Sequence, residues 1–137
     1  MSAPVFYPAL FYRDPAAALA WLERVFQFRK LVAYEGPDGR LAHVEMAFGE
    51  GVIMFGPADA ARRRQSPLDL KGLSLTVYVY VADADAHYAH ARAEGAEITI
   101  EIRDTEYGSR EYSARDLEGQ GWTFGTYRPA ADDPPAA

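Results

Sequence analysis

The sequence predicts an α+β fold in which two βαβββ units follow one another along the chain. A single shift, which carries Asp14 onto Asp83, aligns the helix starts, the hairpin turns and the final strands of the two halves without a gap. The same shift carries Gly39 onto Gly108, and Phe55-Gly56 onto Phe124-Gly125. We therefore interpret the chain as an internal repeat, with units at about 5–56 and 73–127 and a connector at 57–72.

The elements of the first unit can be assigned in order. An apolar and aromatic run at 5–12 predicts a buried strand. Asp14 followed by Pro15 is typical of an N-cap with proline at the first helical position, and it predicts a helix at 16–26. Strands are then expected at 28–35, 40–48 and 52–55, separated by the glycine turns 36–39 and 49–51.

The second unit repeats this plan. A strand is expected at 73–81, and a helix at 84–94 begins after the N-cap Asp83 and ends at Gly95. Three further strands are expected at 96–103, 109–115 and 121–127. The connector is irregular apart from one expected helical turn at 58–63, and the Pro- and Asp-rich residues 130–137 predict a disordered tail.

Composition restricts the classes of function. The 137 residues include 14 Lys and Arg against 20 Asp and Glu, a formal net charge of −6, and no Cys. Such a chain lacks the clustered positive charge that nucleic-acid binders need, and it has no disulfide, cysteine metal site or thiol nucleophile. No apolar run approaches the ~18 residues of a membrane span. We expect one soluble, cytoplasmic domain at 1–129, with no nucleic acid and no membrane as a partner.

Three stretches carry a resemblance to a known family. They are the opening "FYPALFYRDPAAALAWLERVF", its repeat "LTVYVYVADADAHYAHARAEGAEI" and the closing "YGSREYSARDLEGQGWTFGTYRP". The chain resembles the vicinal-oxygen-chelate superfamily of glyoxalases, bleomycin-resistance proteins, fosfomycin-resistance thiol transferases and extradiol dioxygenases. The resemblance implies a cup-shaped, eight-stranded mixed sheet with helices on its convex face, a ligand cleft inside the cup, and a homodimer.

The resemblance also implies where a divalent metal would be held, with one side chain from the first and one from the last strand of each unit. These positions fall on Tyr7, Thr76, Met54 and Thr123. None of them is His, Glu or Asp, the donors that such metal sites use. We therefore expect no metal and no other cofactor.

The three histidines do not supply a clear replacement for these missing metal ligands. His43 and Glu45 alternate with apolar residues in the same strand, so both are expected to point into the cleft. Two ligands from one strand are fewer than a catalytic metal site recruits, and a hydrogen-bonded pair is the favoured interpretation. His87 and His90 lie one turn apart on the second helix, and their polar surroundings predict that they face solvent.

The alternation of the strands predicts an aromatic, hydroxyl-rich cleft. In the second unit, Thr76, Tyr78 and Tyr80 are expected to point into the cup, and Leu75, Val77, Val79 and Val81 toward the helices. The remaining residues expected in the ligand site are Tyr7, Phe11, His43, Glu45, Met54, Arg110, Tyr112 and Thr123. Phenols provide contact area and a hydrogen-bonding tip, which suits a small organic ligand. The same tyrosines could instead fill the sheet interior or a dimer interface.

The leading hypothesis is a metal-independent small-molecule-binding protein. The alternative is a divalent-metal-dependent lyase, isomerase or dioxygenase that uses His43, Glu45 and Tyr7. Two other hypotheses remain open: a metal-free enzyme with a tyrosine or His43 as general acid or base, and a structural module whose cleft is filled by its own side chains.

Overall fold

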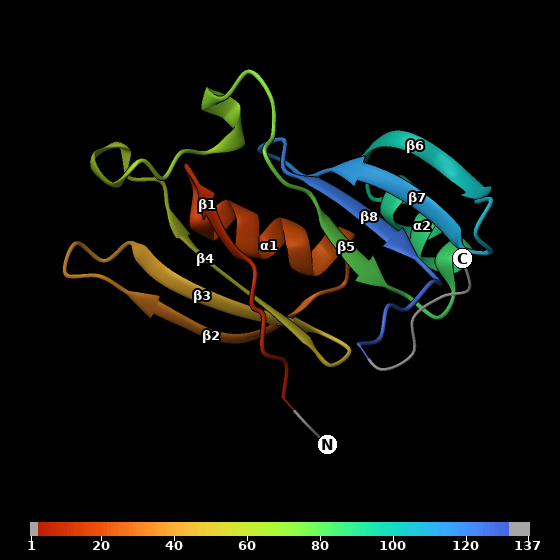
Figure 1. The fold of residues 1–137 in the computed structure, drawn as a ribbon. Coiled ribbons are helices and arrows are strands. Elements are labelled where there is room, and N and C mark those ends of the chain that lie inside the picture. Colours follow the sequence, from red (N-terminus) through yellow and green to blue (C-terminus); the bar gives the residue numbers. More distant parts are fainter. Residues whose placement is uncertain (1–2, 132–137) are drawn as a thin grey trace.

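Two βαβββ units lie side by side in the computed structural model, which describes residues 3–131 (Figure 1). The first unit contains β1 (Ala9–Tyr12), α1 (Pro15–Val25), β2 (Arg29–Glu35), β3 (Leu41–Phe48) and β4 (Gly51–Pro57). The second contains β5 (Val77–Tyr80), α2 (Ala84–Ala93), β6 (Glu97–Asp104), β7 (Arg110–Arg115) and β8 (Gly121–Gly125). Two short 3₁₀ helices, η1 (Ala60–Arg62) and η2 (Pro67–Asp69), lie in the connector.

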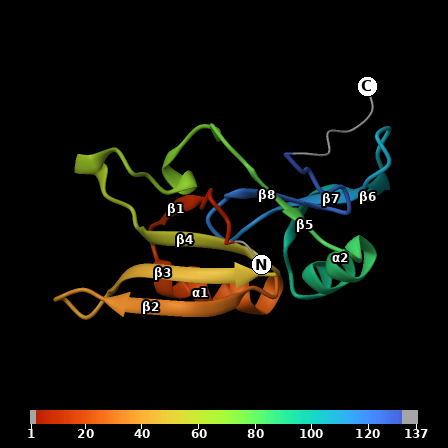
Figure 2. The same cartoon turned by 60° about the horizontal axis from the view of Figure 1, so that its bottom comes forward.

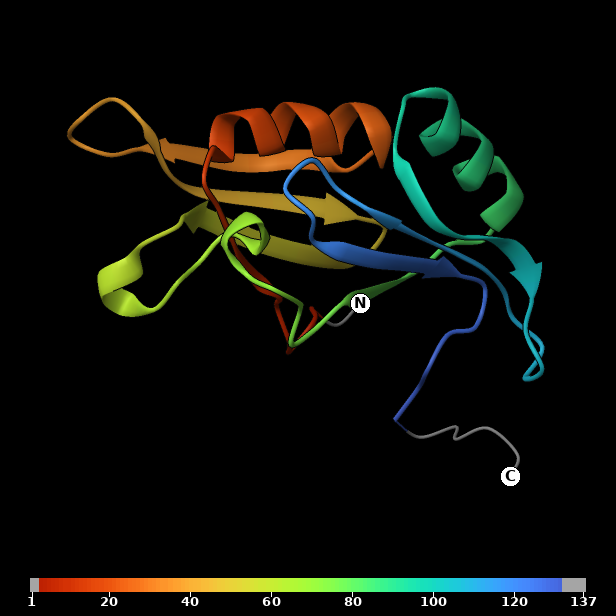
Figure 3. The same ribbon diagram turned by 90° about the horizontal axis from the view of Figure 1, so that it is seen from above.

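The eight strands form two four-stranded mixed sheets, with the orders β1-β4-β3-β2 and β5-β8-β7-β6. In each sheet the first strand of the unit pairs in parallel with the last, and the other pairs are antiparallel. Figure 2 shows the two sheets next to each other, and Figure 3 shows α1 and α2 along one side of the molecule. The predicted α+β fold of two tandem units is therefore confirmed, with the eight strands divided between two sheets.

The helices begin where their N-caps predict. The Asp14 carboxylate accepts a hydrogen bond from the backbone N–H of Ala17 at 3.1 Å, and Asp83 does the same for Ala86 at 3.0 Å. These bonds satisfy donors that the first helical turn leaves without partners. Within residues 3–131, neither helix is long and apolar enough to cross a lipid bilayer.

The first strand of each unit is shorter than predicted. Pro8 accepts a bond from the Met54 N–H at 2.9 Å but has no N–H of its own, so regular pairing starts at Ala9. The preceding Val5 and Phe6 are 84% and 90% exposed. In the second unit β5 starts at Val77, and Leu75 is exposed rather than packed under the helix as predicted. Of the predicted tail, residues 132–137 lie outside the described residues.

The hydrophobic core is continuous across both units. Phe26, at the end of α1, contacts Phe124 of β8 edge-on, with ring centroids 4.8 Å apart. Phe28 contacts Trp122 in the same way at 5.4 Å. These rings are buried between the helices and the two sheets, so the units share one core and do not fold around two separate ones.

His87 belongs to this core, and the prediction that it faces solvent is wrong. Its side chain is buried, with Nε2 3.0 Å from the Phe26 carbonyl oxygen and Nδ1 2.6 Å from the Tyr112 hydroxyl. A neutral imidazole can donate from Nε2 and accept at Nδ1, which satisfies both contacts. His90 is half-buried, with Nε2 2.8 Å from the Arg24 carbonyl oxygen. The polar residues of α2 that led to the prediction of an exposed His87–His90 pair, such as Asp85 and Arg92, are themselves exposed.

We expect the stability of the fold to decrease below about pH 6.5 through His87. Burial lowers the pKa of this imidazole from its ordinary value of 6.5. The unfolded chain therefore takes up a proton at a higher pH than the folded chain, and acid favours unfolding. The unfolding free energy should therefore rise with pH over this range, with a slope from His87 that stays below about 1.4 kcal/mol per pH unit, the limit for one proton. Chemical unfolding at several pH values between 5 and 8 measures it.

The variant His87→Gln isolates this contribution, because glutamine can donate and accept but does not titrate. We expect it to have a shallower slope than the wild type over the same range. His90→Gln is the matched control for removing an imidazole from α2. A slope that is the same in His87→Gln as in the wild type would contradict the assignment.

A β-bulge at Ala42 breaks the constant offset between the two units. Tyr34 pairs with His43 and Glu35 with Leu41, so Ala42 is an extra residue in β3. Consequently Val44 lies opposite Phe55 in the first unit, and Tyr112 lies opposite Phe124 in the second. Val44 and Tyr112 are therefore structural counterparts, although the repeat offset pairs Val44 with the residue after Tyr112. A longer turn between β7 and β8 restores the original offset. A shift of one position turns each side chain of a strand to the other face of its sheet.

The turn between β7 and β8 joins the two units. Asp116 is buried, and its carboxylate accepts bonds from the Tyr12 hydroxyl at 2.5 Å and from Trp122 Nε1 at 3.1 Å. Glu118, also buried, accepts from the backbone N–H groups of Arg13 and Asp14 at 2.6 and 2.9 Å. The second unit therefore completes the hydrogen bonding at the start of α1.

Candidate functional site

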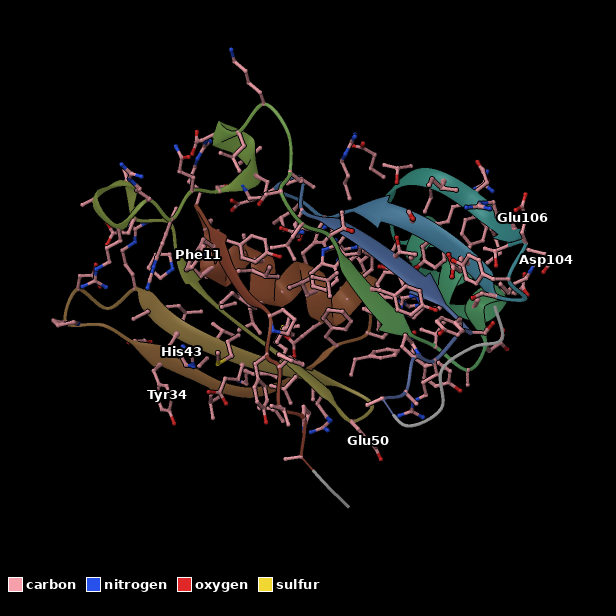
Figure 4. The ribbon with its side chains drawn as sticks, in the orientation of Figure 1. Phe11, Tyr34, His43, Glu50, Asp104 and Glu106 are labelled. Carbon is pink, nitrogen blue, oxygen red and sulfur yellow. The ribbon has the colours of Figure 1, made fainter. Side chains whose placement is uncertain are left out.

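The open face of the first sheet, opposite α1, carries several of the predicted site residues. His43 Nε2 lies 2.9 Å from Glu45 Oε2, and the Tyr34 ring stacks on the imidazole with centroids 6.3 Å apart. Met54 pairs with Glu45 in register, and Phe11 lies on the same face of β1. Figure 4 shows His43 and Tyr34 far from Asp104 and Glu106 at the other end of the molecule. His43 and Glu45 therefore lie on the face of β3 that is turned away from α1.

The open face of the second sheet carries hydroxyl groups, as its alternation predicts. Tyr78 and Tyr80 are 37% and 38% exposed, while Val77 and Val81 are buried in the core that the two units share. Thr123 pairs with Tyr78 in register, and its hydroxyl lies 2.7 Å from the Ser113 hydroxyl. This sheet therefore presents phenols and small hydroxyls.

Arg110 and Tyr112 lie on the opposite face, so their predicted place in the cleft is wrong. Tyr112 is fully buried and its hydroxyl meets His87. Arg110 pairs with Asp85 of α2 at 3.1 Å and with Asp104 at 3.3 Å. The repeat offset makes Tyr112 the counterpart of His43, but because of the bulge at Ala42 its structural counterpart is Val44, whose side chain is buried.

The same shift of one position places Glu111 on the open face of the second sheet, although the sequence predicted it on the opposite face. Glu111 is buried, and its Oε2 accepts a bond from the Tyr107 hydroxyl at 2.6 Å. Gly125 lies opposite it in register, and this glycine leaves room for the Tyr78 hydroxyl. Burial raises the pKa of the Tyr78 phenol, and the Glu111 carboxylate adds to that effect. The Tyr78 hydroxyl donates to the Tyr127 carbonyl at 2.6 Å.

The four positions implied for a metal do not fit one. Met54 has Ala9 and Glu45 as its register neighbours, and Thr123 has Tyr78 and Ser113. The Tyr7 hydroxyl donates to the Pro4 carbonyl at 2.8 Å. Thr76 packs its methyl group toward Gly121, where an added Cβ would lie 2.9 Å away. A thioether, a phenol and two neutral hydroxyls are weak donors for a divalent ion, and residues 3–131 contain no cluster of three His, Asp or Glu suited to one.

A cavity of about 420 Å³ lies between the two units, which we call the inter-unit cavity. Its apolar wall comes from both units and from the segment before β1, and includes Phe6, Phe28, Phe48, Val52, Val79 and Trp122. Of the residues predicted for the ligand site, only Tyr78 and Tyr80 line it. Phe11, His43, Glu45, Met54 and Thr123 remain outside it, on the open faces of the two sheets.

The free edge of β5 borders this cavity. Val81 donates its backbone N–H to the Gly125 carbonyl at 2.8 Å, so odd-numbered residues of this strand bond to β8. The backbone groups of Tyr78 and Tyr80 therefore point away from β8, toward the edge that no strand of residues 3–131 covers. These groups could orient a ligand in the apolar space.

The rim of the inter-unit cavity holds one ion pair. Arg128, just after β8, reaches Glu50 in the turn between β3 and β4, with Nη2 3.4 Å from Oε2. The guanidinium also lies 4.6 Å from the centre of the Tyr80 ring. Glu50 and Arg128 were not singled out from the sequence, because they belong to different units and no motif connects them. Nothing in the local sequence signals that they meet.

Comparisons with known proteins agree with this fold. The model of the Glyoxalase/Bleomycin resistance protein/Dioxygenase superfamily matches residues 5–124. An uncharacterised protein of Mycobacterium bovis is 27% identical over 125 residues, which cover 89% of this chain and 82% of that protein.

Two solved structures illustrate the range of similar folds. TioX from Micromonospora sp. ML1 has a TM-score of 0.73 and 31% identity, over 93% of this chain and 98% of TioX. The fosfomycin resistance protein FosX from Listeria monocytogenes, complexed with Mn(II) and sulfate, has a TM-score of 0.66 and 13% identity, over 93% of this chain and 95% of FosX. The second likeness concerns the fold alone.

Proposed function

Because the chain belongs to the Glyoxalase/Bleomycin resistance protein/Dioxygenase superfamily, we propose that it binds a small organic ligand in the inter-unit cavity without a metal ion. The observation that carries this proposal is the cavity itself, about 420 Å³ with aromatic and aliphatic walls. Ligand sites are concave and mostly apolar, with a few polar groups that fix orientation. Here the edge of β5 and the rim pair Glu50–Arg128 supply those groups.

Metal independence is supported by the donor chemistry at the positions where the family would hold an ion. Met54, Thr76 and Thr123 offer a thioether and hydroxyls, which compete poorly with water for a hard or borderline ion. The cavity is also lined by rings and aliphatic groups, which stabilise a ligand by excluding water from it.

A cavity-filling substitution tests the site. Val52→Trp adds a large ring to a residue that lines the cavity and is half-buried. We expect the Kd for the neutral fluorescent probe N-phenyl-1-naphthylamine to rise at least about tenfold, because the new ring occupies the space that the probe needs. Val32→Trp, a half-buried residue of β2 outside the cavity, is the matched control and should bind the probe like the wild type.

The same titration in the presence of EDTA tests metal independence, and we expect unchanged affinity. Equal binding by Val52→Trp and the wild type would place the ligand elsewhere. Loss of binding with EDTA, restored by Mn²⁺ or Zn²⁺, would favour the second candidate function.

That second candidate is a divalent-metal-dependent lyase, isomerase or dioxygenase. One observation favours it: His43 and Glu45 lie side by side on the open face of β3, 2.9 Å apart. Imidazole and carboxylate are the ligands that such ions prefer. FosX, of similar fold, was solved with Mn(II).

A further inference from the structure

We propose that the ligand of the inter-unit cavity is a flat, apolar molecule with a carboxylate, and that Arg128 binds this carboxylate at the rim. The inference depends on the proposed function, because it assigns a chemical class to the ligand of that same cavity. It does not involve His43, Glu45 or Met54, which lie outside the cavity.

Arg128 is suited to hold an anion. Among the described residues that line the cavity it is the sole cation. The centre of the Tyr80 ring lies 4.6 Å from the guanidinium carbon, a distance at which the ring attracts the cation. A guanidinium has five donors, and the bond to Glu50 at 3.4 Å uses one of them. The remaining donors can form the paired bonds that carboxylates accept from arginine.

Glu50 occupies the position that a ligand carboxylate would take. The side chains of Arg128 and Glu50 are 60% and 66% exposed, and such surface ion pairs contribute little free energy. A ligand whose apolar part is buried in the cavity can therefore displace Glu50 from Arg128. The apolar wall, from Phe28, Phe48 and Trp122, excludes water behind the rim.

A pair of probes of equal shape tests the assignment. We would titrate the protein with 2-naphthoate, an anion at pH 7.5, and with 2-naphthamide, its neutral counterpart, by calorimetry. The variants are Arg128→Gln, which removes the cation, and Glu50→Gln, which removes its competitor. Arg115→Gln is the matched control, since Arg115 is an exposed arginine paired with Glu97 outside the cavity.

We expect the wild type to bind 2-naphthoate about tenfold more tightly than 2-naphthamide, as for a charge-assisted pair of hydrogen bonds. Arg128→Gln should abolish this preference, because it should weaken 2-naphthoate binding about tenfold and 2-naphthamide binding much less. Glu50→Gln should strengthen 2-naphthoate binding about threefold, because the carboxylate of the ligand then has no competitor. Arg115→Gln should behave as the wild type.

The outcomes separate the two proposals. If 2-naphthamide binds as well as 2-naphthoate, or if Arg128→Gln keeps the preference, the cavity binds ligands but the carboxylate assignment is wrong. If neither probe binds at millimolar concentration, while Val52→Trp and the wild type respond alike to N-phenyl-1-naphthylamine, both proposals are wrong.

Discussion

Replacing Asp116 by alanine should lower the free energy of unfolding by about 3–4 kcal/mol. The carboxylate accepts bonds from the Tyr12 hydroxyl, from Trp122 Nε1 and from the backbone N–H groups of Glu118 and Gln120. Alanine would leave four donors in a buried region without partners. Burial raises the pKa of Asp116, which shows that its charge is unfavourable in this place, and the substitution removes that charge. The decrease in unfolding free energy should therefore be smaller than the sum of four broken hydrogen bonds.

Urea unfolding at pH 7.5 measures this effect. Asp104→Ala is the matched control, because Asp104 is an exposed carboxylate in an ion pair with Arg110, and its loss should change stability by less than about 1 kcal/mol. A loss of similar size in the two variants would show that the Asp116 network does not stabilise the junction between the units.

Replacing Gly56 by alanine should cost about 1–3 kcal/mol, because the new methyl group has no space. An added Cβ would lie 2.8 Å from the carbonyl oxygen of Ala42, the bulged residue of β3. That oxygen belongs to the backbone and can move only if the bulge itself changes. The substitution therefore tests whether the bulge, which sets the orientation of His43 and Glu45, is fixed by the glycine opposite it.

Gly51→Ala, in the same strand, is the matched control. Its Cβ would meet its nearest neighbour, the Phe48 carbonyl oxygen, at 3.5 Å, which is ordinary contact. We expect Gly51→Ala to unfold at nearly the wild-type urea concentration and Gly56→Ala at a clearly lower one. Equal midpoints would mean that the bulge accommodates a methyl group without cost.

The fold was predictable because its signals are local. Asp14 with Pro15, and Asp83 alone, are capping residues whose effect depends on the next few residues, and both helices start there. The turn glycines Gly39 and Gly108 adopt positive φ, as tight turns require. The start of β1 was less predictable, since Pro8 limits pairing only through its place beside β4, where its carbonyl accepts from the Met54 N–H.

The candidate site was predictable only where alternation was undisturbed. Tyr78, Tyr80 and Thr123 have the orientation that a regular strand gives them. Arg110 and Tyr112 were misplaced because a bulge in one repeat has no signature in the sequence of the other. The inter-unit cavity combines Phe28, Val52 and Arg128 from segments far apart in the chain, and their proximity follows from tertiary packing alone.

The contacts of Glu118 make one repeat unit dependent on the other. The backbone N–H groups of Arg13 and Asp14, in the first unit, find their hydrogen-bond acceptor in the second unit. Ser66 of the connector donates to the same carboxylate. The first unit on its own would therefore leave these two backbone N–H groups without the acceptor that the second unit provides.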